Sequence, residues 1–165
     1  MTRAGARSGT LLGLALALCL RSAAAAEPPI DRRSYNLGII AAFAEMVGAG
    51  VKTLALSDVL RPQEADALET EAARIAHENG ALVHREPDLL VTDLFPADVA
   101  AGKHVLLIYK GATLDDYRRL KEEKARLERE GRYDDAARRS VAERFGRLLS
   151  YPQSRIDALL AQRAR

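Results

Sequence analysis

The sequence predicts an α/β fold with a small mixed or mostly parallel sheet of about four short strands, flanking helices and a helical C-terminal segment. Two observations predict this class. Segments with apolar residues at three- and four-residue spacing alternate with short apolar runs, which is typical of helices that alternate with strands. The short runs are continuously apolar, and this indicates strands that are buried on both faces.

The first unit is a helix followed by a strand. The helix predicted over 35–47 carries an apolar stripe made of Leu37, Ile40, Phe43 and Val47. Gly48 and Gly50 end this helix, and the apolar run 51–57 is the first predicted strand.

A second helix is predicted over 62–78, because Pro62 suits a first helical turn and Asn79-Gly80 suits a helix end. Three further strands are expected after it. They are the apolar runs 81–84, 89–92 and 104–109.

From residue 112 onward the pattern is purely helical. A helix over 114–130 has a narrow apolar stripe, a helix over 133–149 has a wider one, and Pro152 begins a short closing helix. Gly146 lies inside the second of these helices. Glycine in a helix costs about 1 kcal/mol relative to alanine, so Gly146 indicates a close approach between helices.

The first 26 residues have the layout of a cleavable signal peptide, with a basic start, the apolar run 11–20 and small residues before a cut after Ala26. An uncleaved anchor and lipidation at Cys19 are alternatives, although a membrane span needs about 20 apolar residues. We expect an exported protein, periplasmic or secreted. Its mature part, 27–165, is expected to be one domain without cysteine that does not span a membrane.

Charge divides the mature chain into an α/β part, 27–111, and a helical part, 112–165. The first has 8 Lys and Arg against 13 Asp and Glu, and the second has 14 against 10. This asymmetry indicates either a protein or anionic envelope partner, or basic and acidic parts that pack together. Nucleic acid is not expected as a partner, because export separates the two and ten acids dilute the basic field.

No catalytic, cofactor or metal motif occurs in the sequence. A glycine-rich phosphate loop, a Gly-x-Ser-x-Gly elbow and a His-Glu-x-x-His helix are all missing. The histidines, His77, His84 and His104, lie far apart in the sequence and predict no metal site. We therefore expect neither a cofactor nor a metal.

Ligands of an open parallel sheet bind beyond the carboxyl ends of its strands. The polar residues at those positions are Asp58, Arg85, Glu86, Asp93 and Lys110. They predict a polar binding site or a general acid/base pair, although polar residues that solvate turns follow strands in the same way.

Three functions fit these observations. The expectation is a non-catalytic envelope protein that binds a ligand or a partner. The first alternative is a small hydrolase-like enzyme that uses Asp58, Glu86 or Asp93. The second is a structural or assembly factor that forms homo-oligomers through the helical part. The missing motifs favour binding over catalysis and leave the oligomeric state open.

Overall fold

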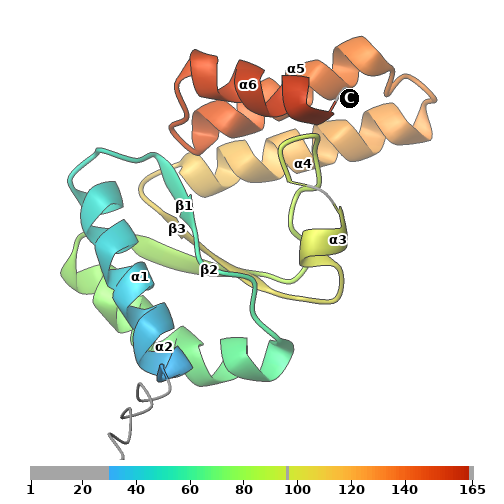
Figure 1. The fold of residues 1–165 in the computed structure, drawn as a ribbon. Coiled ribbons are helices and arrows are strands. Elements are labelled where there is room, and N and C mark those ends of the chain that lie inside the picture. Colours follow the sequence, from blue (N-terminus) through green and yellow to red (C-terminus); the bar gives the residue numbers. More distant parts are fainter. Residues whose placement is uncertain (1–29, 96, 164–165) are drawn as a thin grey trace, which may run out of the picture.

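The computed structural model describes residues 30–95 and 97–163, so the expected leader with its cleavage site and Cys19 lies outside the described residues. The described part is mixed α/β and mostly helical, which confirms the class (Figure 1). The elements in chain order are α1 (Arg32–Gly48), β1 (Leu54–Leu56), α2 (Pro62–Glu78), β2 (Leu82–Glu86), α3 (Ala97–Ala100), β3 (Val105–Tyr109), α4 (Thr113–Arg129), α5 (Asp135–Leu148) and α6 (Gln153–Arg163).

The sheet has three strands in the order β1-β3-β2, and β3 is antiparallel to both neighbours. The prediction of about four mostly parallel strands is therefore wrong. A parallel connection needs a crossover of a dozen or more residues, usually a helix. The segment 87–104 between β2 and β3 is long enough for a crossover, but the only helix among its described residues is the four-residue α3, and the chain returns antiparallel to β2.

The run 89–92, predicted as a strand, has no place in the sheet. Leu89 and Leu90 are buried in the core beneath α4 and α5, and the Leu90 N–H donates to the Tyr117 hydroxyl over 2.9 Å. Thr92 pairs only with Phe95 in a local bridge. A short apolar run fills a core equally well as a strand or as a loop, so its composition does not separate the two.

The sheet lies between two helical layers, α1 with α2 and α4 with α5 (Figure 1). Side chains alternate along β3, with Leu106 and Ile108 packed toward α1 and α2. Val105 and Leu107 pack toward α4 and α5. Both faces of β3 are therefore buried, as its continuous apolar run predicts.

Two glycines permit close approaches between elements. A Cβ on Gly48, at the end of α1, would lie 1.8 Å from the carbonyl oxygen of Asn79, which caps α2. A Cβ on Gly146 would lie 2.8 Å from Ile156 of α6 and 3.0 Å from Leu94. The close helix approach predicted at Gly146 is thus confirmed.

No helix in the described ranges is both long enough and apolar enough to cross a membrane.

Candidate functional site

The antiparallel sheet separates the polar residues that were expected to meet at one edge. The end of β2 at Glu86 pairs with the start of β3 at Val105, and the end of β1 at Leu56 pairs with Leu107. Asp58, just after β1, and Glu86, the last residue of β2, therefore lie at the same end of the sheet. Lys110 follows β3 and lies at the opposite end.

Arg85 lies within β2 and connects the strand to α2. Its guanidinium donates to Asp66 over 2.5 Å, to Glu69 over 3.2 Å and to the Pro62 carbonyl over 3.2 Å. The Nε–H donates to Nδ1 of His104 over 2.7 Å. The hydrogen bond to Asp66 is the main reason why the pKa of Arg85 lies above its ordinary value. All these contacts are internal and hold β2 in place.

Glu86 is a buried carboxylate that connects β2 to α4. It is 6 % exposed and accepts hydrogen bonds from Lys121 Nζ over 3.1 Å and from the Asp88 N–H over 2.9 Å. Lys121 also pairs with the Asp88 carboxylate over 3.0 Å. A buried carboxylate with these donors is satisfied without a ligand.

The remaining two residues also make internal contacts. Asp93 accepts from Arg138 of α5 over 2.7 Å. The Lys110 ammonium donates to the carbonyl of Gly48, at the end of α1, over 3.0 Å. Two of the acids that were expected in the site, Glu86 and Asp93, are therefore paired with cations of the helical part. These ion pairs support the interpretation that the basic and acidic parts pack together.

Asp58 differs from the other four because it lies in a β-bulge beside a cleft. The Ser57 N–H donates to the Leu106 carbonyl over 2.9 Å, and Leu60 and His104 exchange hydrogen bonds of 2.8 Å. Two residues, Asp58 and Val59, therefore lie opposite the single residue Val105. Such bulges redirect side chains and are frequent next to functional sites.

The cleft next to Asp58 has a volume of about 250 Å³ and lies at the free edge of β1, between the two helical layers. One wall comes from α1, and the other comes from the segment 89–100 and the turn after α5. The lining is mainly apolar. Its side chains include Phe43, Leu56, Val59, Phe95, Val99 and Tyr151.

Lys52 is the only cation among the described residues that line this cleft. Its ammonium donates to the Leu149 carbonyl over 2.8 Å and lies 6.0 Å from the Phe43 ring and 5.8 Å from the Tyr151 ring. No described carboxylate forms a salt bridge with it, and desolvation by burial lowers the pKa of Lys52. The cleft thus holds a partly desolvated positive charge between two aromatic rings.

The backbone of β1 is open toward the cleft at Leu56. Hydrogen-bonded pairs alternate along an antiparallel ladder, and the bond from Ser57 to Leu106 sets this alternation. The N–H and C=O of Leu56 therefore point away from β3. Among the described residues, no hydrogen-bonding partner of these two groups is found. Upstream, the Ser150 hydroxyl accepts from the Thr53 N–H over 2.8 Å and connects the start of β1 to the turn after α5.

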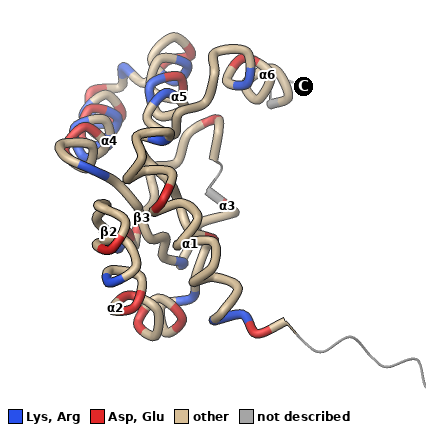
Figure 2. The backbone as a smooth tube through the Cα atoms, turned by 90° about the vertical axis from the view of Figure 1, so that its left-hand side faces the viewer, with Lys and Arg blue, Asp and Glu red and all other residues tan. Residues whose placement is uncertain are grey.

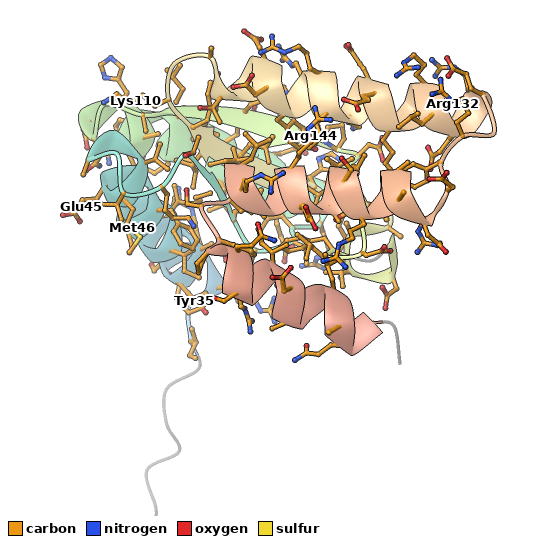
Figure 3. All side chains as sticks on the ribbon, turned by 90° about the horizontal axis from the view of Figure 1, so that it is seen from above. Tyr35, Glu45, Met46, Lys110, Arg132 and Arg144 are labelled. Carbon is orange, nitrogen blue, oxygen red and sulfur yellow. The ribbon has the colours of Figure 1, made fainter. Side chains whose placement is uncertain are left out.

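A second hollow continues from Asp58 toward the start of α1. It has a volume of about 430 Å³ and is lined by Ile30, Arg32, Tyr35, Asn36 and Asp58. Figure 3 shows Tyr35 near the N-terminal end of α1. Because Asp58 lines both hollows, it marks the anionic end of the cleft, and Lys52 marks the cationic end.

The helical part offers a groove with a different character. It lies between α4 and α5, has a volume of about 450 Å³ and includes Arg119, Arg144 and Arg147. Each arginine pairs with an acid of its own layer, as in the contact of Arg144 with Glu123 over 2.7 Å. Figure 2 shows acidic and basic residues interspersed along both helices, and Figure 3 shows Arg144 between them and Arg132 at their far end. The groove therefore presents no uniform field to an anion.

Within the described ranges, no group of three or more His, Cys, Asp or Glu side chains is arranged to hold a metal ion.

Of the residues that line the cleft, Asp58 was a predicted site residue, whereas Lys52, Phe43 and Tyr151 were not. Lys52 belongs to the predicted strand 51–57, Phe43 to a helical stripe and Tyr151 to a helix end. One signal was present in the sequence. A lysine inside an otherwise apolar run is expensive to bury, and it therefore marks a position where the run reaches solvent or a ligand.

No protein-family model, curated protein or solved structure matches this chain.

Proposed function

We propose that the chain is a non-catalytic binding protein that takes a short apolar segment of a partner into the cleft beside β1. The observation that carries this proposal is the coincidence of an apolar cleft with an open strand edge at Leu56. Open strand edges bind extended chains, because the backbone supplies affinity and neighbouring apolar surface supplies selectivity.

The composition of the cleft supports binding rather than hydrolysis. A general acid/base mechanism needs two titratable groups within reach of a substrate. Asp58 is the only carboxylate among the described lining residues, which include no histidine or cysteine, and Lys52 lies at the opposite end of the cleft, before β1. The Ser57 hydroxyl donates to the Asp58 carbonyl over 2.7 Å and accepts from the Leu106 N–H over 2.9 Å. This hydroxyl is therefore committed to holding the bulge.

The assembly alternative has less support from the helical part. Most arginines along α4 and α5 pair with acids on the same helices or on neighbouring elements. Exposed ion pairs of this kind contribute about 0–1 kcal/mol each and present little net charge to a second copy.

The proposed place of action is the cell envelope or the exterior of the cell. The layout of residues 1–26 supports this placement, because a basic start, a short apolar run and small residues are the features of an export signal. A binding protein that acts there would meet extended segments of other envelope proteins.

The first test is a titration of the ¹⁵N-labelled protein with a pool of acetylated tetrapeptides of Leu, Ile, Val and Phe, followed by NMR. We expect shift changes at Leu56, Asp58, Val59 and Tyr151, which line the cleft. Val99→Glu should weaken binding by about tenfold or more, because it places a charge in the apolar cleft.

Leu82→Glu is the matched control, because Leu82 is an exposed apolar residue of β2 at the opposite edge of the sheet, outside the cleft lining, at 48 % against 43 % for Val99. It should leave peptide binding unchanged. Shift changes scattered over the surface, or equal binding by both variants, would rule out the cleft as the site.

A further inference from the structure

We infer that the cleft takes the carboxyl-terminal end of an extended peptide, which adds to β1 as an antiparallel strand with its terminal carboxylate at Lys52. The inference rests on the proposed function and names its ligand. Four features of the cleft carry it: the charge at Lys52, the open backbone at Leu56, the direction of β1 and the position of Asp58.

The positive charge of Lys52 favours a ligand with an anionic group. Its ammonium has three donors, and among the described residues only the Leu149 carbonyl accepts one of them. Desolvation by burial disfavours the charged form, and no described carboxylate pairs with the ammonium. A ligand carboxylate would provide a charge-assisted hydrogen bond at this point.

The open backbone groups of Leu56 favour a peptide ligand. Its outward N–H and C=O need an acceptor and a donor at the spacing of a strand, which an amide backbone provides. A simple apolar carboxylate would satisfy Lys52 but would leave both backbone groups of Leu56 without partners. The pair of features therefore favours a peptide over a small acid.

The direction of β1 determines which end of the peptide meets Lys52. Lys52 precedes β1 and Asp58 follows it. A chain added antiparallel, as β3 already is on the other side, runs from Asp58 toward Lys52. Its carboxyl terminus then arrives at the ammonium. The turn after α5 lies at this end of β1, because its Ser150 hydroxyl accepts from the Thr53 N–H, and we expect it to limit the added strand so that the peptide ends at Lys52.

Asp58 defines the opposite end of the bound segment. The cleft volume of about 250 Å³ accommodates a few residues, and the second hollow continues beyond Asp58. A basic side chain that precedes the apolar residues of the peptide would lie near the Asp58 carboxylate. The preferred ligand is thus an apolar C-terminal segment with a cation upstream.

The experiment compares the tetrapeptide pool with free carboxyl termini and the same pool as carboxamides, by NMR titration. We expect the free acids to bind about tenfold more tightly, which is the scale of one charge-assisted hydrogen bond. In Lys52→Met the two forms should bind equally, as a double-mutant cycle requires. Lys110→Met is the matched control, because this lysine also donates to a single described carbonyl but lies outside the cleft lining.

Two further arms test the strand. Peptides N-methylated at one residue at a time lose a backbone donor, and methylation at the residue opposite Leu56 should abolish binding. Octanoate carries the same anion without a peptide backbone and should bind much more weakly than the free-acid pool. If octanoate bound as tightly as the peptides, or if N-methylation left the affinity unchanged at every position, addition of the peptide to β1 as a strand would be overturned.

The outcomes separate this inference from the function on which it rests. Equal affinity of acids and amides for the unaltered protein would overturn the role of Lys52 and leave the cleft as a binding site. Absence of binding by both pools would overturn the proposed function itself. The peptide arms need no substitution, so they remain decisive even where Lys52→Met fails to fold.

Discussion

Lys52 and Asp58 show how far single residues can be interpreted from the sequence. Asp58 was singled out because it follows a strand, and the structure places it in a bulge at the cleft. Lys52 was not singled out, because it lies inside an apolar run that predicts a buried strand. The environment of the Lys52 ammonium is formed by the ring of Phe43 in α1 and the ring of Tyr151 in the turn after α5. The sequence does not reveal where these two elements lie relative to Lys52.

Two glycines of α1 give a prediction at the same scale. Gly48→Ala places a Cβ against the Asn79 carbonyl, whereas Gly38→Ala meets nothing within 4 Å. We expect Gly48→Ala to lower the free energy of unfolding by about 1–3 kcal/mol, because the ends of α1 and α2 must move apart. Gly38→Ala should raise it by about 0.5–1 kcal/mol through helix propensity. Urea denaturation of both variants measures the contrast, and equal effects would contradict the close approach.

Whole elements were predicted with uneven success, and the reason is physical. The helix over 62–78 was predicted to the residue, because Pro62 and Asn79-Gly80 are strong local signals. The strand direction was wrong, because it depends on how the chain returns after β2, and an apolar run such as 104–109 is the same in either direction. The prediction of a strand over 89–92 was wrong, because this apolar run is buried in the core without pairing in the sheet.

The connection between β2 and the helical part gives a prediction at the scale of elements. Glu86→Ala removes a buried acceptor from Lys121 and from the Asp88 N–H. We expect it to lower the free energy of unfolding by about 2 kcal/mol. Asp93→Ala breaks a half-exposed pair with Arg138 and should cost under about 1 kcal/mol.

Chemical denaturation followed by circular dichroism measures both values, and peptide binding serves as the control readout. Neither residue lines the cleft, so both variants should bind the tetrapeptide pool as the unaltered protein does. Loss of binding in a folded Glu86→Ala variant would mean that this carboxylate belongs to the site after all.

At the scale of the whole molecule, the three layers explain why the cleft lies where it does. The sheet is narrow, and its edge strand β1 has three residues. The two helical layers extend past this edge, with α1 on one side and the segment 89–100 and the turn after α5 on the other. The space between them becomes an apolar cleft with the strand edge at its floor. Class and helices were predictable from periodicity, whereas this cleft depends on the strand order β1-β3-β2.

Amide hydrogen exchange at Leu56 tests the central claim most directly, because its N–H faces the cleft and has no hydrogen-bonding partner among the described residues. Addition of the free-acid tetrapeptide pool should slow this exchange by about tenfold or more, since strand addition supplies an acceptor. Ala55, whose N–H points toward β3 in the ladder, should change little. An unchanged rate at Leu56 with the pool in large excess would contradict strand addition at the edge of β1.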